Sequence, residues 1–206
     1  MIHGYHLIWG TYGFWLPNDP RGSWSDFVAS WELARFGKSK RTLDRAAVLP
    51  EDWSRWRTTA QRALKFPEVV LTGLQARAVA TGFAESVRES GFTIWACSIL
   101  PQRVHLVVAR HTFAAEQIAN LLKGEATKQL KAQSLYPQAK RTVAGGKLPS
   151  IWSGGQWKGY LDSEEAIENA IRYVEENPVK EGMARQNWSF VTPFAGIDQS
   201  GWTTYH

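Results

Sequence analysis

The most informative segment of the sequence is Leu100-Pro101-Gln102-Arg103-Val104-His105-Leu106-Val107-Val108. From Arg103 onward it has the apolar, β-branched composition of a strand, and the two-residue strand period sends Arg103 and His105 to the same face. A second apolar run, 92–99, precedes it, and Pro101-Gln102 supplies a turn between the two. The stretch therefore predicts an antiparallel hairpin that carries one basic residue and one imidazole on one face.

The elements around this hairpin complete a recognisable order. Outward from it, the sequence predicts a strand over 5–11, a helix between the N-cap Thr72 and the stop Gly91, a helix over 113–130, an irregular strand over 151–161, and a helix from Ser163 to Asn177 that Pro178 terminates. The first six elements form a βαββαβ unit. This order predicts an α+β, ferredoxin-like antiparallel sheet with helices on one face, followed by a C-terminal helix.

The 206 residues are expected to form a single domain, 1–206. Periodicity disappears from about 12 to 57, which predicts a long insertion after the first strand, with a short helix around 52–65. A C-terminal tail is expected from about 184 to 206. The linker 136–150 is basic and contains glycine.

Composition narrows the class of protein. Hydrophobic residues make up 44% of the chain, enough for a real core, and no run approaches a membrane span or a signal peptide. One cysteine, Cys97, allows no internal disulfide, so a cytoplasmic location is expected. The net charge of +5 favours an anionic partner, and eleven tryptophans offer faces that can stack on unpaired bases.

The C-terminal helix carries the second candidate pair. Tyr173 and Asn177 are four residues apart and therefore lie on one helix face, at the border of the apolar stripe formed by Ile167, Ala170 and Val174. A tyrosine at such a border is most often an amphipathic core residue. It is also a place where a phenol can be held by packing and still meet a substrate.

Two motifs in order give these residues a context. The strand Pro101-Gln102-Arg103-Val104-His105-Leu106 resembles the Pro-Asn-His-hydrophobic-His-Leu motif of the single-tyrosine HUH transposases, and Tyr173-Val174-Glu175-Glu176-Asn177-Pro178-Val179 resembles their tyrosine helix. The similarity is to REP-associated tyrosine transposases and the transposases of the smallest bacterial insertion sequences. It covers most of the chain except the insertion and the tail after about Met183.

This resemblance implies a transposase, or single-stranded DNA endonuclease, that acts on single-stranded or hairpin DNA in transposition and recombination. It implies that Tyr173 attacks a phosphodiester to give a 5′-phosphotyrosine and a free 3′-hydroxyl. It also implies a divalent metal, Mg²⁺ or Mn²⁺, held by His105 and Asn177. The family that the chain resembles includes monomers and dimers, so a homodimer is possible for this protein.

Arg103 departs from the motif because it stands where the family has its first histidine. A guanidinium has no lone pair to ligate a metal and stays protonated. Either Arg103 acts in catalysis by clamping the phosphate directly, or the metal site is impaired and cleavage is weakened or lost. His6 and His111 are the candidates for replacement ligands.

Basic residues near the predicted helices are the candidates for phosphate contacts: Lys123, Lys128, Lys140, Arg141 and Lys158, with Lys131 and Lys147 beside them. Two alternatives remain beside an active transposase. One is a non-catalytic module that binds hairpin DNA, and the other is a ferredoxin-like RNA-binding or scaffold protein in which tyrosine and histidine are packing residues. No membrane partner is expected.

Overall fold

A computed structural model describes residues 1–16 and 53–197 of the chain. These residues have an α+β fold and form two compact units, the first built from 1–9, 71–136 and 157–197, the second from 10–16, 53–70 and 137–156. The elements are β1 (Gly4–Gly10), α2 (Trp53–Arg62), α3 (Gly73–Ser90), β2 (Ile94–Ile99), β3 (Arg103–Ala109), α4 (Ala115–Ala132), β4 (Trp157–Leu161) and α5 (Glu164–Lys180).

The sheet of the first unit confirms the predicted ferredoxin-like order. Its four strands lie in the order β2-β3-β1-β4, so that β1 sits between β3 and β4 although β4 is the last strand in sequence. β2 and β3 form the predicted antiparallel hairpin, with Ser98 opposite His105. β1 pairs with β4 in an antiparallel register that places His6 opposite Gly159.

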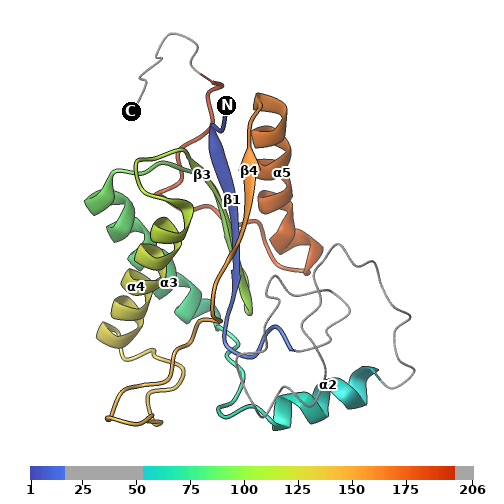
Figure 1. Cartoon of the computed structure of the whole chain (residues 1–206), viewed down its shortest axis with the longest axis vertical. Coiled ribbons are helices and arrows are strands. Elements are labelled where there is room, and N and C mark those ends of the chain that lie inside the picture. The colour runs from blue at the N-terminus through green and yellow to red at the C-terminus, as the bar shows by residue number, and fades with distance from the viewer. Residues whose placement is uncertain (17–52, 198–206) are drawn as a thin grey trace. The chain divides into compact units, whose positions relative to one another are not determined.

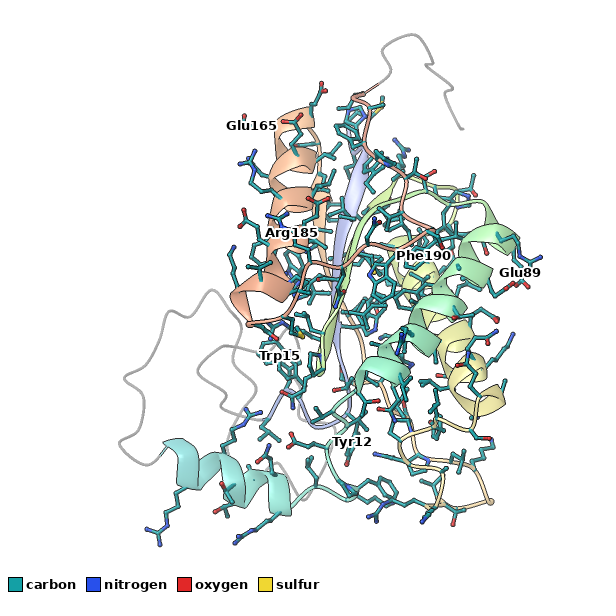
Figure 2. All side chains as sticks on the ribbon, turned by 180° about the vertical axis from the view of Figure 1, so that it is seen from behind. Tyr12, Trp15, Glu89, Glu165, Arg185 and Phe190 are labelled. Carbon is teal, nitrogen blue, oxygen red and sulfur yellow. The ribbon has the colours of Figure 1, made fainter. Side chains whose placement is uncertain are left out.

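The sheet separates two layers of helix (Figure 1). α3 and α4 cover one face, where Trp9, Phe83 and Leu122 are buried. α5 covers the other face, where its residues Ile167, Ala170 and Val174 pack against Ala96 and Val107. In Figure 2, Glu89 on α3 and Glu165 on α5 lie on opposite sides of the strands. The tyrosine helix therefore lies across the sheet from the two helices of the βαββαβ unit.

Local sequence signals fix the ends of α3. The Thr72 hydroxyl accepts a hydrogen bond from the Gln75 backbone N–H, and the Gln75 side chain accepts one from Thr72 N–H, which makes a complete capping box. Gly91 ends the helix in the left-handed region at φ 71°, as predicted.

Two element boundaries differ from the sequence prediction. β4 begins only at Trp157, and Trp152 instead bridges Thr11 within the second unit. α5 continues through Pro178 to Lys180. Proline removes a single donor near the end of the helix, and Glu181 N–H still bonds the carbonyl of Asn177, so the last turn forms despite the ring.

The C-terminal segment 183–197 packs against the exposed edge of β2. The Gln186 side chain bonds both the N–H and the C=O of Ile99, at 2.8 and 2.9 Å. Further along, Thr192 N–H donates to the Ile94 carbonyl, and Phe194 meets the Trp95 ring edge-on. These contacts satisfy backbone groups that an edge strand would leave open. Residues 198–206, the end of the predicted tail, lie outside the described residues.

The second unit holds the described parts of the predicted insertion, of which 17–52 lies outside the described residues. The Thr11 hydroxyl donates to the Val69 carbonyl at 2.6 Å, and Gln138 donates to the Pro67 carbonyl at 3.1 Å. α2 confirms the short helix predicted around 52–65. No helix of the described residues is long and apolar enough to cross a membrane.

A pair of glycines tests the packing of α3 on α4. A Cβ at Gly82 would lie 2.5 Å from the Ala126 backbone nitrogen, whereas a Cβ at Gly124 would meet nothing within 4 Å. We expect Gly82→Ala to lower the free energy of unfolding by about 1–3 kcal/mol, because backbone atoms cannot yield, despite the better helix propensity of alanine. Gly124→Ala should raise it by up to about 1 kcal/mol. Urea denaturation measures both, and equal effects would contradict the close approach of the helices.

Candidate functional site

Side chains from three neighbouring strands meet on the face that α5 covers. Arg103 and His105 leave β3 on this face, as the strand period predicts, and His6 joins them from β1 because β1 lies beside β3. The His6 and His105 rings have centroids 5.9 Å apart. Trp157 of β4 meets the His6 ring edge-on at 5.2 Å. The two imidazoles are 8% and 3% exposed, so the site has a buried floor.

Tyr173 lies over this floor. Its ring centroid is 5.7 Å from that of His6 and 5.8 Å from that of His105, both edge-on. The side chain is 44% exposed, and the Lys180 ammonium lies 5.4 Å from the centre of its ring. The tyrosine and both histidines thus come together within a single chain, and the phenol remains accessible to a substrate.

Arg103 joins the strand to the end of α5. Its Nε donates a hydrogen bond to Nε2 of His105 at 3.1 Å, and its guanidinium forms an ion pair with Glu181. Asn177 lies on α5 between Tyr173 and Glu181, one turn from each, and is 4% exposed. The sequence placed it at the border of the apolar stripe, and in the structure its side chain lies on the buried side of that border.

Burial keeps both imidazoles neutral. Removal from water lowers the pKa of His6 to about 4. Burial, and then the charges of His6 and Arg103, lowers the pKa of His105 to about 3. Three buried polar atoms here have no hydrogen-bond partner among the described residues, namely Nε2 of His6, Nδ1 of His105 and Nδ2 of Asn177. Buried polar atoms of this kind can be paired by a water, an ion or a ligand.

The donor set is a poor fit to the divalent metal expected from the resemblance. A His105 that accepts through Nε2 must carry its proton on Nδ1, so neither nitrogen has a lone pair left for a metal. Mg²⁺ prefers oxygen ligands, and no group of three or more His, Cys, Asp or Glu side chains in the described part of the chain is arranged to hold an ion. Metal ligation by His105 and Asn177 stays an untested prediction, and the Arg103 contact argues against it.

Of the predicted phosphate-binding residues, the three in the first unit do not gather around Tyr173. Lys123 lies on the α3–α4 side of the sheet, with its ammonium 5.5 Å from the Trp9 ring centre, and burial lowers its pKa to about 8. Lys128 forms an ion pair with Glu125. Lys158 bonds Glu116 on α4, and hydrogen bonds to Glu116 and Tyr160 raise its pKa to about 12. Lys140 and Arg141 belong to the second unit and are exposed.

Of the two histidines predicted as replacement ligands, one lies in the site and the other does not. His111 packs against the Phe92 and Phe113 rings, and its Nδ1 accepts from the Phe113 N–H. His6 is part of the site. Sequence reasoning missed Trp157 and Glu181. The helix period could have found Glu181, eight residues after Tyr173, whereas the place of Trp157 follows only from the pairing of β4 with β1.

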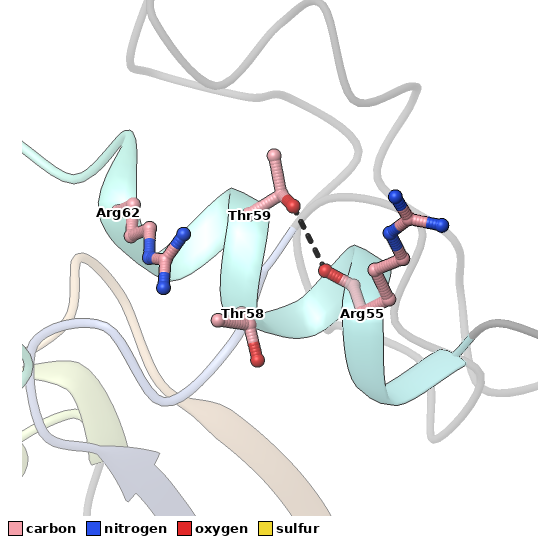
Figure 3. A pocket seen from close by; sticks show the side chains of 4 residues that line it. All are labelled: Arg55, Thr58, Thr59 and Arg62. Carbon is pink, nitrogen blue, oxygen red and sulfur yellow. Dashed lines mark hydrogen bonds between the residues drawn. The ribbon is translucent and has the colours of Figure 1, made fainter.

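A separate polar hollow of about 480 Å³ lies along α2 in the second unit (Figure 3). It is lined by Arg55, Thr58, Thr59 and Arg62, which share one helix face. The Thr59 hydroxyl donates to the Arg55 carbonyl at 2.9 Å. All four side chains are exposed, and the hollow contains none of the predicted site residues.

Among solved structures, this chain is similar to transposases. A REP-associated tyrosine transposase bound to a REP hairpin matches with a TM-score of 0.46 and 14% identity, over 91% of this chain and 74% of that chain. A transposase-like protein from Deinococcus radiodurans matches with a TM-score of 0.39 and 15% identity, over 89% and 93%. No family model and no curated protein matches the chain. Both TM-scores are below 0.5.

The buried histidines predict acid sensitivity. Their pKa values are lower in the folded chain than the usual 6.5, so the unfolded chain takes up protons first as the pH falls. The stability from burying them neutral is therefore present above about pH 6.5 and declines toward pH 4. Between pH 7 and pH 5 we expect a loss of about 2 kcal/mol for each histidine. Urea denaturation at both pH values measures it.

His6→Gln removes one of the two titrating groups and keeps a polar side chain in its place. The difference in unfolding free energy between the two pH values should then shrink by about half. Identical pH dependence in the parent and the variant would show that His6 is not buried as a neutral group.

Proposed function

We propose that the protein binds single-stranded or hairpin DNA and presents Tyr173 to a phosphodiester, as a transposase-type protein does. The observation that carries this proposal is an exposed phenol held against two buried, neutral imidazoles. The motif resemblance supports it, because Tyr173 and His105 are the matching residues. The basic balance of the chain supports a polyanionic partner.

In the proposed reaction, the Tyr173 oxygen forms a bond to phosphorus and the bond to the 3′-oxygen breaks. The products are a 5′-phosphotyrosine and a free 3′-hydroxyl, and the covalent bond is retained for rejoining. The phenol proton needs an acceptor, and the leaving oxygen needs a donor. Nε2 of His6 has no partner among the described residues, so we assign it the first role. The protonated imidazole then gives this proton to the leaving 3′-oxygen, which becomes the free 3′-hydroxyl. A bound phosphate would offset the effect of burial and raise the basicity of this imidazole.

A second candidate is a module that binds DNA without cutting it. It is favoured by one observation, the Arg103 guanidinium at the position where the resembling family has a metal-ligating histidine. Both candidates use the same surface and the same DNA. They differ only in whether a covalent product forms.

A labelled hairpin oligonucleotide distinguishes the two candidates. We expect a covalent protein–DNA band on a denaturing gel, which Tyr173→Phe abolishes because it removes only the attacking oxygen. Tyr160→Phe is the matched control, since Tyr160 is 54% exposed but lies on β4 with its ring against Tyr5 rather than His6. Binding without a band favours the module. A band that persists in Tyr173→Phe assigns the attack to another residue.

Salt dependence tests the predicted phosphate contacts. Exposed cations that bind phosphate release counterions, and each contributes about −0.7 to the log–log slope of affinity against salt for single strands. Neutralising Lys140 and Arg141 together should make the slope shallower by about one unit or more. Lys128→Gln should change it little, because Glu125 already pairs with Lys128. A flat dependence in the parent protein would contradict DNA binding.

A further inference from the structure

The contact between Arg103 and His105 says what kind of ligand the site can accept. Arg103 donates through Nε to Nε2 of His105, which leaves Nδ1 of that ring as an N–H donor. This Nδ1 is buried and has no partner among the described residues, and the same holds for Nδ2 of Asn177, which is also a donor. Two of the three unpartnered atoms of the site are therefore donors, and one of them belongs to the ring that the guanidinium contacts.

Donors and a guanidinium suit an anion, whereas a metal ion needs lone pairs. A phosphodiester offers two acceptor oxygens with one negative charge, and guanidinium binds such a group through two parallel hydrogen bonds. A dication placed a few ångströms from Arg103 would be repelled by the guanidinium charge. The buried, neutral imidazoles and the low local dielectric would screen this repulsion little. We propose that this is a metal-independent phosphate site, in which Arg103 supplies the positive charge. This inference rests on the proposed function, because it takes the bound anion to be a phosphate of DNA.

Glu181 has a defined part in this site. In the free protein it pairs with the Arg103 guanidinium, and both side chains are only partly exposed, 25% for Arg103 and 32% for Glu181. An incoming phosphate would compete with this carboxylate for the same donors. Glu181 therefore holds Arg103 in place beside His105 while no phosphate is bound. Phosphate binding must break this ion pair, so Glu181 weakens the affinity of the site for phosphate.

Calorimetry with Mn²⁺ and no DNA tests the metal half of the inference. We expect no binding to the parent protein at millimolar Mn²⁺. Arg103→His should gain binding, because it restores a neutral nitrogen and removes the repelling charge. Uptake of Mn²⁺ by the parent that His105→Gln abolishes would overturn the inference and leave the proposed function standing.

Fluorescence anisotropy with a labelled single-stranded oligonucleotide tests the phosphate half. With EDTA present the parent should bind, and Mn²⁺ should change the Kd by less than about twofold. Arg103→Gln should weaken binding about tenfold or more, because hydrogen bonds to a charged group are lost. Glu181→Gln should tighten binding, since the competing carboxylate is gone.

Arg88→Gln is the matched control, because Arg88 pairs with Glu85 as Arg103 pairs with Glu181, but on α3 across the sheet. Its affinity should stay within about twofold of the parent's. Arg103→Lys keeps the positive charge but loses the two parallel hydrogen bonds of a guanidinium, so its affinity should lie between those of the parent and Arg103→Gln. Thermal unfolding followed by circular dichroism checks that each variant folds. Loss of binding in EDTA, or equal affinity of parent and Arg103→Gln, would overturn the inference. No oligonucleotide binding under any condition would instead overturn the proposed function.

Discussion

The site depends on the packing of one helix against one sheet face. Ile167, Ala170 and Val174 bury the apolar stripe of α5 against Ala96 and Val107. This burial fixes the rotation of the helix about its axis, and with it the direction of Tyr173 toward the histidines. A helix rotated by one residue, about 100°, would carry the phenol away from them. The segment 183–197 adds to this constraint, because it returns from α5 to the edge of β2.

Arg103 changes the chemistry that this packing makes available. In the resembling family a histidine at this position helps to hold a metal. Here the guanidinium takes up the lone pair of His105 and binds Glu181 at the end of α5. One side chain therefore connects β3 to the helix that carries the tyrosine and places a fixed positive charge beside it. In the phosphate site proposed above, this fixed charge favours an anion over a cation.

Charge is distributed differently from what composition suggested. Lys128 and Lys158 are neutralised by glutamates, and Lys123 packs on an aromatic ring. None of the three lies on the face of the sheet that carries Tyr173. Net charge favours an anionic partner, but ion pairing decides which cations can reach it, since a lysine already in an ion pair gains little from a phosphate.

Sequence patterns predicted most helices and strands, and which residues share a face within each of them. Periodicity and caps gave α3 with its limits at Thr72 and Gly91, the β2–β3 hairpin, and the shared faces of Arg103 with His105 and of Tyr173 with Asn177. These are local properties, set by backbone geometry over a few residues. Tertiary structure alone decided that His6 belongs to the site and His111 does not, because the strand order puts β1 beside β3. Tertiary structure also decided the contacts of Arg103. Its hydrogen bond to Glu181 joins residues 78 apart in the chain, so it depends on where β3 meets the end of α5 and not on a local sequence pattern.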